Sequence, residues 1–157
     1  SNAIEQFILA LLRLDEQLFC DTFDELIDKH GLETTFSEHV VPFLDRIGVM
    51  WLVGTINPAQ EHFISHLIRQ KIITAIDKLE AKSGDEVKKA VLYLPEHEWH
   101  ELGLLFYHYV LKKMGWKIYY LGQSVPLDAL KQIIEQVNPN LVVSSWIVSV
   151  DNCIVTF

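Results

Sequence analysis

The sequence predicts an α/β protein in which an N-terminal four-helix bundle precedes a Rossmann-like, flavodoxin-like parallel sheet. Apolar residues recur at helical spacing through the first half of the chain. A linker of small and charged residues follows at 81–85. Beyond it, apolar runs of strand length alternate with helical segments, an order that is typical of a parallel sheet. We therefore expect two domains, at residues 4–80 and 86–157.

Capping residues divide the first half into its expected helices. Asp21 is a candidate N-cap for the second helix, and a glycine at position 31 follows its expected end. The last helix has the clearest start, because Asn57, Pro58 and Gln60 form a capping-box pattern. Short connections between such helices are typical of an antiparallel bundle. The expected helices are residues 4–20, 22–29, 33–50 and 58–80.

The second half is expected to place a ligand-binding loop at the end of its first strand. In parallel sheets, ligands bind outside the carboxyl ends of the strands. The loop that follows the first expected strand, residues 95–101, therefore lies at the expected binding edge. The expected strands are residues 90–94, 116–121 and 141–145, and the expected helices between them are residues 102–113 and 126–137.

Composition excludes several classes of protein. The formal net charge is −8, and residues 1–80 carry 6 basic and 13 acidic side chains, so this chain by itself is not expected to bind DNA. No apolar run is long enough to span a membrane and no export signal is present, so a cytoplasmic protein without membrane contact is expected. Cys20 and Cys153 are far apart, which disfavours both a disulfide framework and a structural zinc site.

The expected binding loop contains a carboxylate, a histidine and a glycine in a suggestive pattern. Glu98 precedes His100 by two residues, and Gly103 follows three residues later. A carboxylate at this spacing can accept the N–H of one imidazole nitrogen and leave the other nitrogen for a metal. A glycine lets the backbone approach a flat ligand closely. The pattern indicates a metal-supporting loop rather than a phosphate-binding one.

These residues resemble the Asp-x-His-x-x-Gly signature of the cobalamin-binding fold of methionine synthase and its relatives, with Glu98 in place of the commoner Asp. The resemblance implies that His100 is the lower axial ligand of cobalt. Ser145-Trp146-Ile147 is similar to the second signature of that fold, Ser-x-Leu. The third signature, a Gly-Gly pair, and two of the five strands of the fold do not occur before Phe157. We therefore expect the cobalamin-binding α/β domain to be C-terminally incomplete.

A second motif lies in the helical half. Trp51, followed after nine residues by Glu61 and His62, resembles the Trp-x9-Glu-His motif of light-sensing, adenosylcobalamin-dependent regulators of the MerR class. The resemblance implies that the corrin lies between bundle and sheet and that Trp51 packs on the adenosyl group. Glu61 and His62 would contact the upper face, and His62 would become an upper cobalt ligand after light releases that group.

The resemblance predicts a regulator rather than an enzyme. The expected function is cobalamin-dependent transcriptional control, with adenosylcobalamin or methylcobalamin as cofactor. The chain would form a homo-oligomer, and DNA would be bound only through an N-terminal winged-helix domain outside it. Two alternatives stay open, a corrinoid carrier for methyl transfer and a regulator that has lost its cofactor.

Structural roles compete with these assignments. Taken alone, Trp51 is more typical of a helix-bundle core, and Glu61 with His62 of a polar helix surface. His62 and His66 are four residues apart, as in some zinc sites, but the His-Glu-x-x-His pattern is absent, which disfavours zinc. Glu96 and Glu101 are expected to be solvated loop charges. Four histidines are expected to be surface or satisfied core groups, namely His30, His39, His97 and His108.

Overall fold

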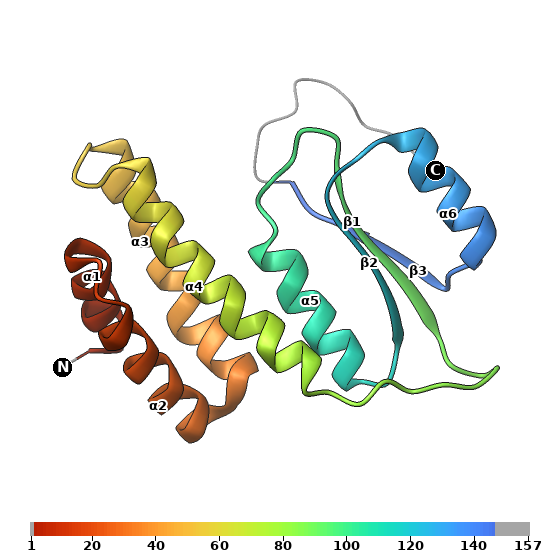
Figure 1. The fold of residues 1–157 in the computed structure, drawn as a ribbon, viewed down its shortest axis with the longest axis horizontal. Helices are drawn as coiled ribbons and strands as arrows, with labels where there is room; N and C mark the ends of the chain where they lie inside the picture. Colours follow the sequence, from red (N-terminus) through yellow and green to blue (C-terminus); the bar gives the residue numbers. More distant parts are fainter. Residues whose placement is uncertain (1, 147–157) are drawn as a thin grey trace. The chain divides into compact units, whose positions relative to one another are not determined.

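The computed structural model describes residues 2–146 (Figure 1). The chain divides into two compact units, Ser1–Ala75 and Ile76–Phe157, and each is described by itself. The first unit is helical and the second contains a parallel sheet, so the predicted fold class is confirmed. Within residues 2–146, no helix is long and apolar enough to cross a membrane. Ile147 and Cys153, which entered the sequence interpretation, lie outside the described residues.

The helical unit contains four α-helices within the described residues, but its first break differs from the expected one. Leu14 adopts a left-handed conformation with φ of 53°, and the carboxylate of Asp15 accepts the backbone N–H of Leu18 at 2.9 Å. The expectation of one helix over residues 4–20 with Asp21 as the next cap is therefore wrong. Apolar spacing continues through this break, so the spacing by itself does not reveal it. The elements are α1 (Ala3–Arg13), α2 (Glu16–Thr35), η1 (Phe36–Val40), α3 (Val41–Leu52) and α4 (Pro58–Asp77).

The other helix signals act as expected, with one addition. Gly31 takes non-helical angles (φ 77°, ψ 168°) and kinks α2. The π-helical turn η1 ends two residues before Pro42, which has no N–H to donate and whose ring crowds the preceding turn. The N–H of Val41 bonds to the carbonyl of Phe36, five residues earlier. At the start of α4, Asn57 and Gln60 form the reciprocal capping box with two bonds of 3.0 Å.

Aromatic rings hold the helical unit together. Phe7 of α1 lies 5.2 Å from Phe19 of α2 and 5.3 Å from Phe43 of α3, measured between ring centroids. All three side chains are completely buried. Burial of each such ring contributes about 1.5–3 kcal/mol. The rings therefore fix the positions of three helices, including α3, whose last turn carries Trp51.

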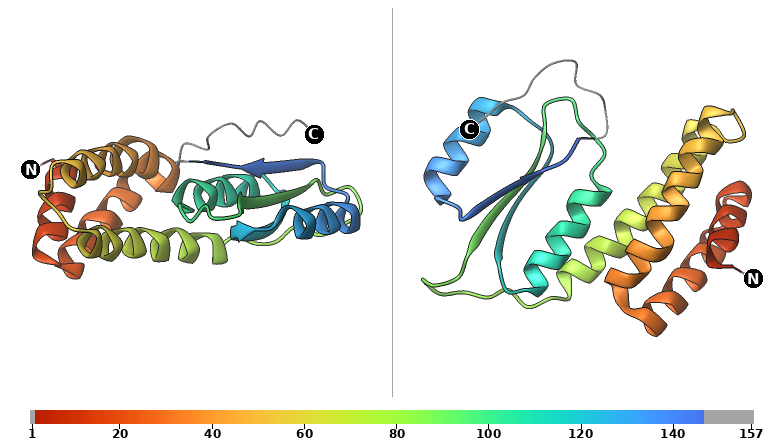
Figure 2. Two further views of the ribbon diagram at one scale, coloured as in Figure 1. Left: turned by 90° about the horizontal axis from the view of Figure 1, so that it is seen from above. Right: turned by 180° about the vertical axis from the view of Figure 1, so that it is seen from behind.

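The second unit is a three-stranded parallel sheet with the order β2-β1-β3, formed by β1 (Lys89–Pro95), β2 (Lys117–Val125) and β3 (Leu141–Ser144). Alternate residues of β1 face opposite sides. Leu92 packs with Leu104 of α5 (Leu102–Lys113), and Val91 packs with Leu130 of α6 (Leu127–Val137). Figures 1 and 2 show the two helices on opposite sides of the strands. The middle strand β1 is thus buried on both sides, and its carboxyl end leads into the predicted binding loop.

His108 of α5 is a half-buried histidine that stacks on Tyr120 of β2, with the ring centroids 5.0 Å apart and the planes 18° from parallel. Its Nδ1 is buried and has no hydrogen-bond partner among the described residues. Burial disfavours the charged imidazole, and Lys112 adds to the effect, so the pKa of His108 falls from 6.5 to about 4. His108 is therefore neither a surface histidine nor a satisfied core histidine, and the expectation for it is wrong.

This lowered pKa predicts an acid-dependent loss of stability. Above pH 6.5 the side chain is neutral in both folded and unfolded protein. As the pH falls from 6.5 toward about 4, His108 binds a proton in the unfolded chain but stays neutral in the folded protein. The free energy of unfolding therefore decreases. After allowance for solvent screening at this half-buried site, we expect a loss of about 2 kcal/mol. Urea unfolding at pH 7 and pH 4.5 should show a smaller loss for His108→Phe than for the wild type. Equal losses would contradict the prediction.

Candidate functional site

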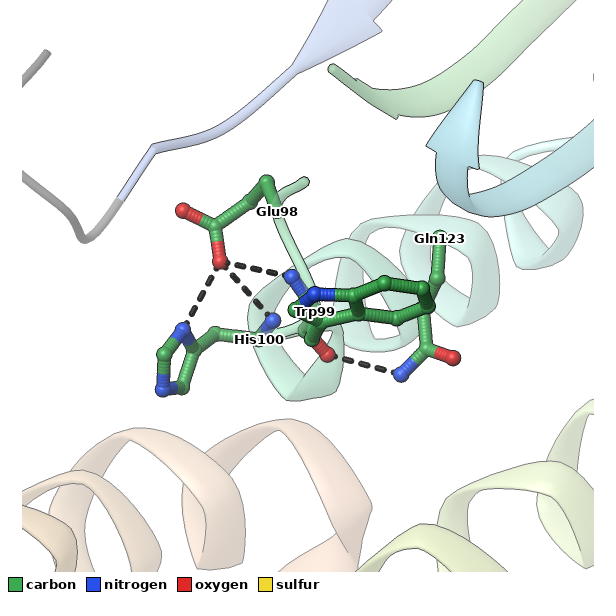
Figure 3. A network of polar contacts seen from close by, with 4 residues as sticks. All are labelled: Glu98, Trp99, His100 and Gln123. Atoms are coloured by element: carbon green, nitrogen blue, oxygen red, sulfur yellow. Dashed lines mark hydrogen bonds and ion pairs between the residues drawn. The ribbon is translucent and has the colours of Figure 1, made fainter. Parts of the chain in front are cut away.

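The loop after β1 is organised around the carboxylate of Glu98, whose side chain is only 4% exposed. Its Oε1 atom accepts the backbone N–H groups of Trp99 and His100, both at 2.9 Å. The same atom lies 2.7 Å from Nδ1 of the His100 ring. Figure 3 shows the three contacts converging on one oxygen. The glutamate thus shapes the backbone and orients the histidine at the same time.

The pairing leaves one nitrogen of His100 available to a ligand. In the neutral imidazole, the carboxylate acceptor Oε1 favours the tautomer with the proton on Nδ1, which leaves the lone pair on Nε2. The His100 side chain is 59% exposed, and Nε2 has no hydrogen bond to the residues drawn in Figure 3. A neutral imidazole with a carboxylate behind it is a donor suited to a transition metal. The chemistry of this pair therefore fits the cobalt ligand expected from the sequence.

Gly103 and Ser145 lie near the ends of elements that border the same edge of the sheet. Gly103 is in the first turn of α5, and a Cβ added there would meet nothing within 4 Å. Packing among the described residues therefore does not require a glycine at this position. Ser145 directly follows β3 and is half-buried. The Ser-x-Leu signature ends at Ile147, which lies outside the described residues.

The end of β2 holds this loop through residues that the sequence interpretation missed. The N–H of Ser124 donates to the carbonyl of Glu98 at 3.2 Å, and Ser124 Oγ accepts the N–H of His97 at 3.1 Å. Gln123 donates its side-chain amide to the carbonyl of Trp99 at 2.7 Å. A glycine and two polar residues at positions 122–124, directly after the expected apolar strand, were the sequence signal that could have indicated these contacts.

Glu101, expected to be a solvated loop charge, is only 6% exposed. Its carboxylate accepts a hydrogen bond of 2.8 Å from the hydroxyl of Tyr120 on β2. The expectation is wrong because the tyrosine hydroxyl offers a donor inside the fold, which lowers the cost of burying the carboxylate. This bond is a further link between β2 and the segment that contains His100.

In the helical unit, Trp51 lies in the last turn of α3 and is 57% exposed. Leu52 and Val53, the next two residues, are exposed as well. With this exposure, Trp51 is not a residue of the helix-bundle core, which was the alternative to a role in binding. It offers apolar surface at the end of the bundle.

Glu61 and His62 lie in the first turns of α4 and contact each other. Glu61 Oε2 is 2.7 Å from His62 Nδ1, and the His62 side chain is 68% exposed. The His62 and His66 ring centroids are 6.5 Å apart. Across the part of the chain that the structure describes, no group of three or more His, Cys, Asp and Glu side chains could hold a metal ion. The contact between the Glu61 carboxylate and Nδ1 of His62 has the same length, 2.7 Å, as that between Glu98 and Nδ1 of His100.

Comparison with known proteins finds a family that matches the helical unit and relatives that match most of the chain. Residues 3–75 match the family described as "B12 binding domain". The chain is 29% identical to the HTH-type transcriptional repressor CarH of Myxococcus xanthus over 145 residues, which cover 92% of this chain and 48% of that protein. It is 31% identical to the HTH-type transcriptional repressor CarA of the same organism over 135 residues, which cover 85% of this chain and 38% of that protein. The chain thus spans about half or less of the length of these relatives.

Two solved structures are also similar. The methanol:cobalamin methyltransferase complex MtaBC from Methanosarcina barkeri has a TM-score of 0.45 at 13% identity, over 90% of this chain and 55% of that one. A cobalamin-binding protein from Desulfitobacterium hafniense has a TM-score of 0.40 at 18% identity, over 93% of this chain and 69% of that one. The helical unit of this chain thus matches the B12 binding domain family, and the chain is homologous to CarH and CarA over most of its own length.

Proposed function

We propose that this chain is the cobalamin-binding sensor part of a transcription regulator. The observation that carries the proposal is the Glu98–His100 pair, in which a buried carboxylate holds Nδ1 at 2.7 Å and leaves Nε2 for a metal. The match of residues 3–75 to the B12 binding domain family supports cobalamin as the ligand. Homology to two transcriptional repressors supports a regulatory rather than a catalytic role.

The α/β unit would supply the lower axial ligand. His100 would bind cobalt through Nε2, and Glu98 would keep the proton on Nδ1. Gly103 presents no side chain and has open space around its Cα, which suits close approach of a flat ligand. Ser145, at the end of β3, is a candidate contact for the remainder of the cofactor.

The helical unit would supply contacts to the upper side of the cofactor. Trp51 is exposed and can cover an adenosyl group with its ring, so adenosylcobalamin is the proposed form and methylcobalamin the alternative. Glu61 would orient His62 as Glu98 orients His100, which makes His62 the proposed second protein ligand to cobalt. Bound cobalamin would supply a cobalt–carbon bond that light can break.

The output would be a change in DNA binding. This chain covers 48% of CarH and 38% of CarA, both named as HTH-type repressors, so we place DNA binding in a part of the protein outside these 157 residues. The acidic helical half, with 6 basic and 13 acidic residues, favours the same assignment. We propose that the protein is cytoplasmic. We also propose that the state of its bound cobalamin controls homo-oligomerisation and thereby the affinity for DNA.

Replacing His100 tests the proposed lower ligand. His100→Asn should weaken adenosylcobalamin binding roughly 10- to 100-fold, because the axial nitrogen is lost. His97→Asn is the matched control, since His97 is exposed in the same loop and its φ of 70° is one that asparagine tolerates. Protein is mixed with adenosylcobalamin in the dark and desalted, and its visible spectrum is read before and after green light. A wild type that retains no colour, or two variants that bind alike, would refute the proposal.

Replacing Trp51 tests the proposed contact with the adenosyl group. Trp51→Ala should lower the affinity for adenosylcobalamin about tenfold by removing apolar contact area. The affinity for methylcobalamin should change much less, because its upper group is small. Leu52→Ala is the control, since Leu52 is an exposed apolar neighbour in the same helical turn. Titrations followed by absorbance measure both affinities, and equal losses for the two cofactors would argue against this role of Trp51.

A further inference from the structure

The peptide group that joins Trp99 to His100 is held at both of its polar ends. On one side its N–H, which belongs to His100, donates to Glu98 Oε1 at 2.9 Å. On the other side its carbonyl, which belongs to Trp99, accepts from Gln123 Nε2 at 2.7 Å. Figure 3 shows both contacts. Because a peptide unit is planar and rigid, fixing its two ends fixes the direction in which the chain enters the Cα of His100.

Neither end is held by an ordinary strand or helix hydrogen bond. The turn around Glu98 uses two successive N–H groups, of Trp99 and His100, for one carboxylate oxygen. The carbonyl of Trp99 therefore needs a donor from elsewhere in the chain or from water. Gln123 provides one across 24 residues of sequence.

The shape of β2 brings Gln123 to this position. The pairing of β1 with β2 shifts register between Leu92 and Tyr93 and again between Tyr93 and Pro95. Gly122 and Ser124, on either side of Gln123, have φ values of 75° and 51°. Such a bulge re-aims side chains at the end of a strand. Ser124 in turn bonds the backbone of His97 and Glu98, so residues 123–124 hold three consecutive residues that lead to His100.

We propose that Gln123 is a positioning residue for His100, acting through the carbonyl of Trp99. The inference rests on the proposed function, in which Nε2 of His100 binds cobalt. Glu98 sets which nitrogen is available, and Gln123 sets where that nitrogen lies by preventing the Trp99–His100 peptide from rotating. Gln123 is itself exposed and belongs to neither hydrophobic cluster of the sheet, so its removal should leave the fold intact.

The test compares three substitutions in the full-length protein. Gln123→Met keeps the length of the side chain but removes the donor, and Gln123→Lys keeps the reach and restores a donor. Gln136→Met makes the same chemical change at an exposed position of α6. One exposed hydrogen bond corresponds to an effect of roughly 2- to 10-fold.

Two readouts are needed, one with cofactor and one without. With adenosylcobalamin, the dissociation constant and the fraction of cofactor whose spectrum shows histidine ligation are measured. Without cofactor, hydrogen exchange of the His100 amide is followed by NMR. We expect Gln123→Met to weaken binding several-fold, to lower the histidine-ligated fraction and to speed exchange of this amide. Gln123→Lys and Gln136→Met should match the wild type.

The outcomes separate this inference from the proposed function. Wild-type values for Gln123→Met in both readouts would overturn the positioning role, as would equal losses in the Met and Lys variants, since a restored donor should rescue. If the wild-type protein binds no cobalamin, the proposed function fails, and exchange of the His100 amide then decides the positioning role by itself.

Discussion

The carboxylate of Glu98 lies almost entirely inside the α/β unit and accepts three N–H donors on one oxygen atom. Burial of a charge on this scale is costly unless hydrogen bonds replace the lost water, and here two backbone amides and an imidazole do so. The need to give the buried carboxylate these hydrogen-bond donors determines the conformation of the loop that follows β1. His100 is therefore exposed for binding while its other nitrogen is engaged, which is the arrangement that a metal-binding histidine needs.

The residues around Glu98 show how a parallel sheet builds such a site. The carboxyl end of β1 delivers the loop, and the irregular end of β2 closes on it through Ser124 and Gln123. Tyr120 adds a bond to Glu101, one residue beyond His100. The loop is thus held by side chains and backbone from a neighbouring strand. This support explains how an exposed histidine on a loop can still have a defined orientation.

Much of this could be predicted from the sequence, because several signals are local. The spacing of Glu98 and His100 predicts their contact, and the capping pattern at Asn57 predicts the start of α4. The break before Asp15 was missed because apolar spacing continues across it while capping chemistry decides the boundary. Glu101 and Gln123 were missed for a different reason. Their partners, Tyr120 and Trp99, are 19 and 24 residues away in sequence, and only the folded sheet brings them together.

The central claim is that Glu98 holds His100 in the tautomer that leaves Nε2 free to bind a metal. The most direct measurement is the ¹⁵N NMR spectrum of the His100 imidazole in cofactor-free protein at a pH where the ring is neutral. We expect Nδ1 to carry the proton and Nε2 to carry the lone pair. A spectrum in which Nε2 carries the proton would contradict it, because that nitrogen could then bind cobalt only after the pairing with Glu98 had been broken.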